Sequence, residues 1–380
     1  MATAAPAAPA QRKQLPFTLG SAFTSRQAFQ TPNIPLAAST SMPQGFPLQI
    51  KSYGWITNIT LNFTLTFTAG ASTAFGADGV DALIDSIGVR TSGGNPLIQP
   101  IGGYALHMDN IFGGKRFGAS TLPFGTDPDQ LPGTALGITA SAANTITFTR
   151  SLQFEIDASS GLGSIPATAS NREFTIDLTV ASLSTLFPTG TPASANVSIN
   201  ATAWYWDLPA DGAVPFGVDQ TGQTLRLLSR EQGAVNAGTN KVQSVNRGNV
   251  FGNHILIFRE NGVRVDADFP LTSEITIDNN VRLWLTRSEW KAQMGAWFGL
   301  GLNGQAADTA GGLRSGVYVI PWRLLAGGSG NNPHNSHAQY LATMNTTQVE
   351  FTGYNYGNSG TLEILGDQVS TPNAAYIYSK

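Results

Sequence analysis

The hydrophobic positions of this chain recur with a period of two residues. In the clearest run, every second residue is Ile, Leu or Phe: Ile59, Leu61, Phe63, Leu65 and Phe67. The residues between them are Thr or Asn. This alternation puts the two sets on opposite faces of a β-strand, which a helix cannot do. The run predicts a half-buried antiparallel strand whose outer face suits packing or hydrogen bonding more than open water.

Further runs with this period lie at residues 146–156, 174–180, 197–205 and, less cleanly, 275–285. A short apolar run at 254–258 and the segments 316–320 and 349–356 are also predicted to be strands. Thr, Val, Ile and aromatic residues fill these runs, and Gly, Pro, Asn and Asp separate them, which is typical of short strands joined by loops. The chain is therefore predicted to be all-β. We also expect a short helix or turn at residues 80–87 and a loop at residues 92–133.

One helix is predicted, over residues 288–298. Its apolar residues are spaced i, i+4, i+7 and i+8, so they form one stripe along the helix that packs onto a sheet. Thr286 and Glu289 fit a capping box at its start, although Ser288 could equally be the cap. The stripe consists of Trp290, Met294, Trp297 and Phe298.

The length of 380 residues exceeds what one β-sandwich needs and favours two domains, each with its own core. Both halves contain an aromatic-rich strand near their end, at residues 203–206 and 351–356. Pro209 and Gly212 are strong breakers directly after the first of these strands. We therefore predict a domain boundary near residue 212. The expected division is an arm at 1–44, a first sandwich at 45–212 and a second at 213–380.

Charged residues make up only 12% of the chain, against roughly a quarter in an ordinary soluble domain. A surface so poor in charge has little electrostatic protection against association. The composition therefore favours a protein that is buried in an assembly over a solitary Thr-rich β-protein. The chain has no cysteine, which excludes disulfides and thiolate metal sites and leaves the redox compartment open.

The first residues, Met1 to Ala10, are mostly Ala and Pro, and Arg12 and Lys13 follow them, which is not the order of a secretory signal. No apolar stretch approaches the roughly 20 residues that span a bilayer. We expect a protein that is soluble where it is made, with an N-terminal arm that orders only on a partner. Arg12, Lys13 and Arg26 give this arm a weak attraction to anionic surfaces, but they are too sparse for DNA binding.

Four histidines and several aspartates are the candidate metal ligands. His334 and His337 form a His-x-x-His pair, but they lie in a loop rich in Asn, Gly and Pro without a nearby carboxylate, so we assign them to an exposed or interface loop. His107 and His254 stand alone. The aspartates are assigned to turns and caps, because their spacing is not that of a calcium loop; a structural ion is the lesser alternative. They are Asp78, Asp81, Asp85, Asp127 and Asp129.

Motifs for catalysis are absent from the sequence. It has no Gly-x-Ser-x-Gly elbow, phosphate loop or dinucleotide fingerprint. A glycosidase needs two facing carboxylates, and four on predicted strands could in principle supply them: Glu155, Asp157, Glu173 and Asp177. Nothing in the pattern brings two of these carboxylates across one cleft. We therefore expect neither enzyme activity nor a cofactor.

The order of landmarks resembles that of a known family, the double jelly-roll major capsid proteins of tectivirus-like tailless phages with an internal membrane, which are related in architecture to the adenovirus hexon. The likeness lies in the order of these segments, in their spacing and in their general residue composition, over roughly residues 45 to 366. The segments that carry it are Ile56–Phe67, Gly102–His107, Ser151–Ile156, Phe174–Leu178, Ala203–Pro209, Trp290–Gln293 and Arg314–Tyr318.

The resemblance implies two consecutive eight-stranded jelly rolls with a few short helices and a flexible N-terminal arm. It implies a homotrimer with a pseudo-hexagonal outline that tiles an icosahedral shell around an internal membrane. Such a subunit is made in the host cytoplasm and ends in the virion. Its partners are its own copies, neighbouring capsomers, vertex and minor capsid proteins and the membrane surface, without direct binding of nucleic acid. The family brings no catalytic residue or cofactor. The arm residues Arg12, Lys13 and Arg26 would face inward.

A second hypothesis comes from the aromatic residues. Trp204, Tyr205, Trp206 and Trp322 could form platforms for sugar rings, as in a carbohydrate-binding or carbohydrate-cleaving β-sandwich protein. The capsid fold of tailed phages is not expected, because that fold would show a long spine helix and the sequence predicts none.

Overall fold

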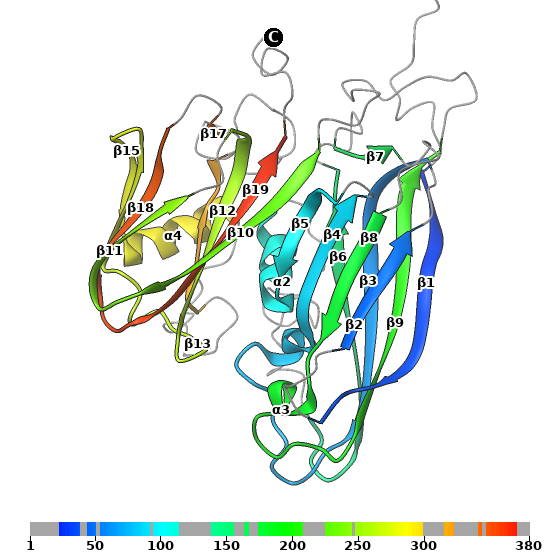
Figure 1. Ribbon diagram of the computed structural model, residues 1–380. Helices are drawn as coiled ribbons and strands as arrows, with labels where there is room; N and C mark the ends of the chain where they lie inside the picture. The colour runs from blue at the N-terminus through cyan, green and yellow to red at the C-terminus, as the bar shows by residue number, and fades with distance from the viewer. Residues whose placement is uncertain are drawn as a thin grey trace, which may run out of the picture.

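The computed structural model describes residues 23–38, 44–50, 54–91, 94–113, 138–155, 163–166, 174–207, 225–244, 248–298, 315–322, 341–343 and 347–370. These residues form three β-sheets and a few short helices (Figure 1). The all-β prediction is confirmed. Among the described helices, none combines the length and apolar character that crossing a bilayer requires.

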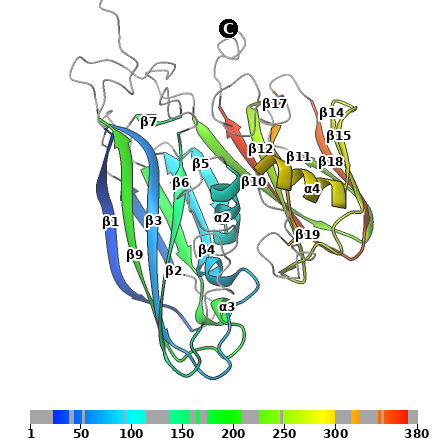
Figure 2. The same ribbon diagram turned by 180° about the vertical axis from the view of Figure 1, so that it is seen from behind.

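The first sheet has five strands, all from the first half of the chain. Its strands are antiparallel, in the order β1 (Phe23–Pro35), β9 (Ala195–Trp206), β3 (Trp55–Thr68) and β6 (Ala143–Gln153), and the short β7 (Ile165–Pro166) pairs with the start of β3. The strand predicted from the clearest alternation is β3. Figure 2 shows this sheet from its outer side.

The second sheet has ten strands and contains both halves of the chain. Its order is β13 (Val263–Arg264), β12 (Val250–Glu260), β19 (Gly360–Val369), β10 (Arg226–Val235), β5 (Pro96–Ile101), β4 (Ile84–Thr91), β8 (Phe174–Val180) and β2 (Gln44–Ile50), with β16 (Val317–Ile320) and β17 (Leu341–Ala342) also paired to β12. The halves meet where β10 runs parallel to β5, with Leu228 opposite Ile98. The sheet is therefore continuous across the molecule.

The third sheet has four strands, all from the second half: β11 (Gly238–Ser244), β18 (Val349–Tyr356), β14 (Thr272–Ile277) and β15 (Asn280–Thr286). Each half is thus a sandwich of two layers: a sheet formed by that half alone and one part of the ten-stranded sheet. The predicted boundary near residue 212 lies outside the described residues, and the division of the chain at that point stays a prediction.

Apolar side chains fill the space between the sheets. The inward residues of β3 are at most 5% exposed, and Phe63 stacks on Phe148 of β6 at 4.9 Å between ring centres. In the second half, Phe269 stacks on Tyr318 at 3.6 Å. Each buried Phe or Leu side chain contributes roughly 1.5 to 3 kcal/mol, so these alternating runs account for much of the folding free energy.

The helices are η1 (Gly79–Leu83), α2 (Gly103–Phe112), α3 (Leu183–Leu186) and α4 (Arg287–Phe298). The predicted helix is α4, and its capping box is confirmed: the Glu289 carboxylate accepts from the Thr286 backbone N–H at 2.9 Å, and the Thr286 hydroxyl accepts from the Glu289 N–H at 3.3 Å. Trp290 is buried as a core anchor and donates its Nε1–H to the Val319 carbonyl at 2.8 Å.

Three predictions about local structure are wrong in whole or in part. The helix or turn expected at residues 80–87 ends with η1 at Leu83, because Ile84–Thr91 form β4 and pair with β8. Residues 92–133 are not one loop, because β5 and α2 lie within them. The sequence hid α2 because it is buried on almost every side and so lacks an amphipathic stripe. The expectation that residues 1–44 order only on a partner is also wrong for β1, which pairs with β9. Bulges after Gln27 and Thr31 shift its register and break the alternation that marks a strand.

Candidate functional site

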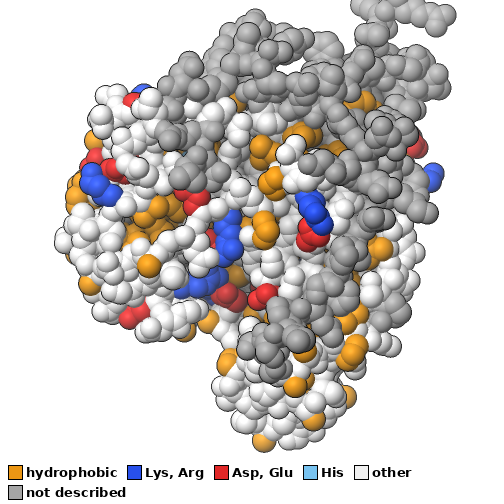
Figure 3. Space-filling model, viewed as in Figure 1, with side chains coloured by type: hydrophobic (Ala, Val, Ile, Leu, Met, Phe, Trp, Pro, Cys, Tyr) orange, Lys and Arg blue, Asp and Glu red, His pale blue; other side chains and the backbone are white. Residues whose placement is uncertain are grey.

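The most concentrated chemistry in the described residues is a set of buried charges where the two halves meet. We call it the junction network and define it by the residues Asp78, Tyr104, Asp109, Arg226, Arg259, Arg264 and Asp367. Several of the charged side chains visible in Figure 3 lie over the middle of the molecule, whereas its lower end shows none. The network itself lies largely beneath this surface, and its hydrogen bonds join Asp78, Tyr104 and Asp109 of the first half to arginines of the second. The network therefore marks the contact between the sandwiches.

Arg226, the first residue of β10, binds both halves at once. Its Nη2 donates to Asp109 of α2 at 2.6 Å, its Nε to Asp367 of β19 at 2.7 Å, and its Nη1 to the Gln153 carbonyl at 2.9 Å. Burial alone would lower the pKa of Arg226, but Asp109 and Asp367 outweigh it and hold the pKa above its usual value. The guanidinium is therefore always charged and always compensated.

A second part of the network surrounds Asp78, which precedes η1. Its carboxylate accepts from Arg259 Nη2 and from Arg264 Nε, each at 2.9 Å. Arg264 also donates to the Tyr104 hydroxyl at 2.8 Å, and its guanidinium carbon lies 3.8 Å from the centre of that ring. Since both arginines belong to the second half and Asp78 and Tyr104 to the first, these contacts fix the angle between the sandwiches.

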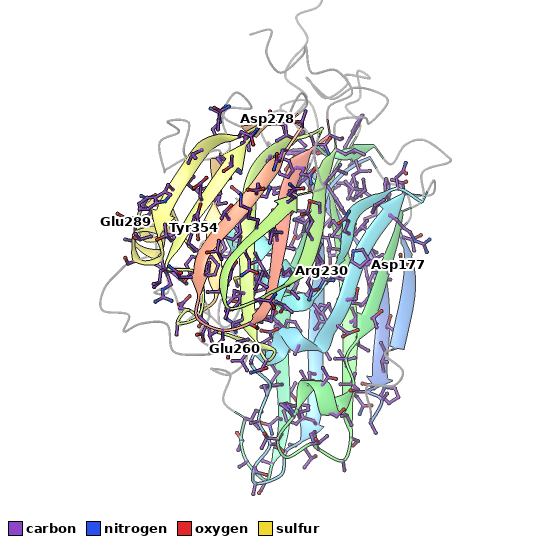
Figure 4. The ribbon with its side chains drawn as sticks, turned by 60° about the vertical axis from the view of Figure 1, so that its left-hand side comes forward. Asp177, Arg230, Glu260, Asp278, Glu289 and Tyr354 are labelled. Carbon is purple, nitrogen blue, oxygen red and sulfur yellow. The ribbon has the colours of Figure 1, made fainter. Side chains whose placement is uncertain are left out.

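Further charged pairs link strands β10, β12 and β19 of the ten-stranded sheet. Glu363 of β19 accepts from Arg259 at 3.2 Å and from Arg230 of β10 at 2.7 Å. Arg230 also contacts the first half, because its backbone N–H donates to the Gln99 side-chain oxygen at 2.6 Å. Figure 4 shows Arg230 and Asp177 on this same sheet.

A separate buried triad lies inside the first half. The Asp81 carboxylate accepts from Arg150 Nε at 2.7 Å and lies 2.7 Å from His107 Nδ1, and all three side chains are at most 1% exposed. Burial raises the pKa of Asp81, but Arg150 and His107 together outweigh it, so the pKa lies below its ordinary value. Asp81 therefore stays ionised and holds η1, α2 and β6 together.

The predicted aspartate roles are corrected by these contacts. Asp78 and Asp81 serve as anions for arginines rather than as turn or cap residues, and the side chain of Asp78 makes no cap hydrogen bond at the start of η1. Asp85 is exposed on β4 and does not join them. Within the described part of the chain, no three His, Asp or Glu side chains are arranged to hold a metal ion. Asp127, Asp129, His334 and His337 lie outside the described residues.

The candidate glycosidase carboxylates do not form a pair in the described residues. Glu155 follows β6 of the five-stranded sheet, is buried, and accepts from Trp206 Nε1 at 2.9 Å. Asp177 lies on β8 of the ten-stranded sheet and pairs with Arg90 at 2.7 Å. Asp157 and Glu173 lie outside the described residues. The two carboxylates that can be placed thus lie on different sheets.

The aromatic residues proposed as sugar platforms are mostly committed to packing. Tyr205 is 2% and Trp322 7% exposed, so neither can stack on a ligand. Trp204 and Trp206 are partly buried, and the exposed Phe23 of β1 packs on both, with ring centres 5.7 and 4.8 Å apart. They form an aromatic corner of the five-stranded sheet rather than an open platform.

Of the three cationic arm residues, only Arg26 is described. It lies in the middle of β1 opposite Ala203 of β9, with its guanidinium carbon 5.9 Å from the centre of the Tyr205 ring. It is therefore part of the sheet and not of a free arm. Arg12 and Lys13 lie outside the described residues.

His254 of β12 is buried and neutral. Its Nδ1 accepts from Trp322 Nε1 at 2.7 Å, and its ring stacks on Phe251 at 4.4 Å between centres. Burial lowers its pKa from 6.5 to about 4, although Asp367 opposes the shift. Between these two pH values the unfolded chain takes up a proton that the folded chain refuses, so His254 makes the protein less stable as the pH falls.

We therefore expect the His254→Gln variant to be less sensitive to acid. Lowering the pH from 7.5 to 5 costs about 2 kcal/mol of unfolding free energy through His254 alone, and this loss is absent when the residue cannot titrate. Urea unfolding of both proteins at the two pH values measures how much unfolding free energy each loses. The contributions of carboxylates that titrate alike in the two proteins cancel in the comparison. An equal loss in the two proteins would show that His254 titrates normally in the fold.

The arginines of the junction network were missed by sequence reasoning. Arg226 stands before Leu227 and Leu228, and Arg264 between Val263 and Val265, so each is a single cation among apolar strand residues. A lone charge at such a position is a sign of a buried partner. The pattern could have pointed to buried pairs, but the identity of the partners, over a hundred residues away in several cases, could not be read from it.

Comparison with known proteins adds to this picture. No protein-family model and no curated protein matches the sequence. The fold, however, is similar to solved structures of viral capsid proteins, among them the following three. The major capsid protein of Sulfolobus turreted icosahedral virus aligns with a TM-score of 0.63 at 14% identity, over 94% of this chain and 100% of that one.

The capsid protein of the virus PBCV-1 aligns with a TM-score of 0.60 at 13% identity, over 92% of this chain and 93% of that one. The major capsid protein of bacteriophage PM2 aligns with a TM-score of 0.56 at 11% identity, over 93% of this chain and 99% of that one. Both halves are included in each alignment, because each covers more than nine tenths of the chain. The chain therefore has the double jelly-roll fold of viral major capsid proteins.

Proposed function

We propose that the chain is a viral major capsid protein, a structural subunit without enzymatic activity that resides in the virion shell. The observation that carries this proposal is the extent of the fold similarity: the whole chain of one solved capsid-protein structure aligns with 94% of this chain. The low charge content agrees with it, because subunits that stand side by side bury their flanks, where each charge would have to be paired or desolvated at a cost.

The finer proposal is a homotrimeric capsomer with a pseudo-hexagonal outline. Three chains of two similar sandwiches present six sandwiches around one axis, which is a shape that tiles a facet. The described structure supports it in one respect: the junction network and the continuous sheet hold the two sandwiches of a chain as one body. A ring of three requires a heterologous contact, in which two different surfaces of each chain meet.

Light scattering coupled to size-exclusion chromatography tests this proposal. We expect the purified chain to have a mass close to three times 40.0 kDa, and electron microscopy of the same sample to show threefold particles. The physical reason is that a charge-poor surface gains by burial against a copy and has little repulsion to overcome. A monomer at micromolar concentration would contradict the capsomer.

We further propose that the segment before β1, with Arg12 and Lys13, faces an internal membrane, and that vertex and minor capsid proteins are further partners. Each Lys or Arg near an anionic leaflet contributes about 1 kcal/mol, so two residues per chain bias the contact in a many-copy shell without fixing it. Co-sedimentation of the purified protein with anionic vesicles tests the proposed contact with a membrane. Equal recovery of the protein with anionic and with neutral vesicles would contradict that contact.

A further inference from the structure

The outer face of the five-stranded sheet carries no charged side chain along four strands. We call it the neutral face. It consists of the outward residues of β1, β9, β3 and β6. Phe23, Trp204 and Trp206 form an aromatic corner of this face, where Trp206 donates to the buried Glu155, which follows β6. The rest of the face is mainly Ser, Thr, Asn and Gln: Ser25, Gln27, Gln30, Asn196, Ser198, Asn200, Thr202, Asn58, Thr60, Asn62, Thr64, Thr66, Thr68, Thr145, Thr147 and Thr149. Arg26 of β1 has the opposite parity and lies against Tyr205 instead. Figure 2 shows this side of the sheet toward the viewer.

The other sheet of the same sandwich is different. On the outward side of β4 and β8, Arg90 and Asp177 form an ion pair of 2.7 Å with about half of each side chain exposed, and Asp85 is exposed nearby. A protein surface in water commonly has a quarter to a third of its residues charged. The low charge of the whole chain therefore does not explain the neutral face, because one sandwich keeps charges on one side and excludes them from the other.

The side chains of the neutral face are already hydrogen-bonded to one another. Thr149 donates to Asn62 at 2.7 Å across β6 and β3, and Trp204 Nε1 donates to Thr60 at 3.0 Å across β9 and β3. Gln27 of β1 donates to Asn200 of β9 at 3.3 Å. Groups that are satisfied within the sheet lose little when water is removed, so covering this face costs less than covering an ordinary polar surface.

The size of the neutral face fits a stable contact. Its four strands have 11 to 14 residues each. At about 3.3 Å per residue and about 4.8 Å per strand, the sheet measures about 40 Å by about 19 Å, or roughly 750 Å². A standard interface buries about 800 Å² on each partner. At one corner, Phe23 is 50% exposed and supplies an aromatic anchor of the kind that concentrates binding energy.

We propose that the neutral face packs against the neutral face of a second copy of this chain, across a twofold axis between neighbouring capsomers. Hydroxyl and amide side chains both donate and accept, so this face is complementary to itself, as an isologous contact requires. The contacts that close a ring of three are heterologous and need no such self-complementarity. This inference rests on the proposed capsomer, since it assigns the surface through which capsomers meet.

Variants that introduce charges of either sign at two exposed positions test the proposal. Thr147 of β6 and Asn200 of β9 are both exposed and are separated by β3, so substituting both leaves the sheet pairing intact. The Thr147→Glu, Asn200→Glu variant should keep the trimer mass and lose association between trimers, because each contact then brings four like charges together. The Thr147→Lys, Asn200→Lys variant should behave alike. A one-to-one mixture of the two variants should restore association, because opposite charges then face each other.

Sedimentation velocity over a range of concentrations, with microscopy of any shells, gives the readout. The matched control is Thr175→Glu on β8, which adds a charge to the other sheet opposite Arg90 and should associate as the unmodified protein does. A thermal melt of each variant confirms folding.

The outcomes separate this inference from the proposed function. Undiminished association of the Glu variant, no restoration in the mixture, or no association of unmodified trimers at any concentration would overturn the neutral face as the contact while leaving the trimer in place. Loss of the trimer itself in the Glu variant would also overturn it, since the face would then belong inside the capsomer. A monomeric unmodified protein would instead contradict the proposed capsomer.

Discussion

Replacing Arg226 with methionine is expected to lower the free energy of unfolding by about 3 to 5 kcal/mol. The substitution keeps the length of the side chain but removes the cation that Asp109 and Asp367 share, at 2.6 and 2.7 Å, in an interior where each of these residues is about 5% exposed or less. Two buried carboxylates would then be left without their shared cation. Urea unfolding of the purified protein at pH 7.5 measures the loss.

The Arg90→Met variant is the matched control for Arg226. Arg90 also forms an ion pair with an aspartate at 2.7 Å, but its side chain is 51% exposed and that of Asp177 46%. Because water compensates exposed charges, we expect a change of less than about 1 kcal/mol. Similar losses in the two variants would show that burial at the junction does not decide the effect, and a small loss for Arg226→Met would contradict the junction network as a main source of stability.

Replacing Asp81 with asparagine is expected to have an effect of the same size, about 3 to 5 kcal/mol. The side chain keeps its shape, but Arg150 and His107 lose the carboxylate between them, and both are 1% exposed. Since the pKa of Asp81 is depressed in the fold, its contribution is present at neutral pH and is lost as the pH falls through that depressed value. Asp81→Asn should therefore cost more at pH 7 than in strong acid.

Urea unfolding of the Asp81→Asn variant across the acid range checks both the size and the sign of this effect. The Asp85→Asn variant is the control, because Asp85 lies four residues further on and is exposed. It should change the unfolding free energy by no more than about 0.5 kcal/mol, as is usual for surface sites. A loss for Asp81→Asn that grows in acid would mean that the carboxyl is protonated in the fold.

The strands that sequence analysis found are those whose two faces differ most. β8, and β3 from Asn58 onward, alternate between buried apolar and less buried polar residues, so their period is visible without any neighbour. β10 and β19 were missed. In β19 eight successive residues from Leu362 to Val369 are buried, Glu363, Asp367 and Gln368 among them, so the strand has no polar face to contrast with its core face.

The candidate site was less predictable than the fold for a related reason. Asp78 and Asp81 were noticed in the sequence, but their roles depend on Arg259, Arg264 and Arg150, which are 69 to 186 residues away along the chain. Nothing local distinguishes an aspartate in a turn from one that holds a distant arginine. The Thr286 and Glu289 capping box, by contrast, was predicted correctly because all of its atoms lie within four residues.

The parallel pairing of β10 with β5 has a mechanical consequence for a shell. A subunit whose two halves share one sheet, and whose arginines bind carboxylates across the junction, resists bending between its halves. In the proposed virion the curvature from one facet to the next would therefore be taken up at the seams between capsomers, and each tile would keep its shape when the particle swells or is squeezed.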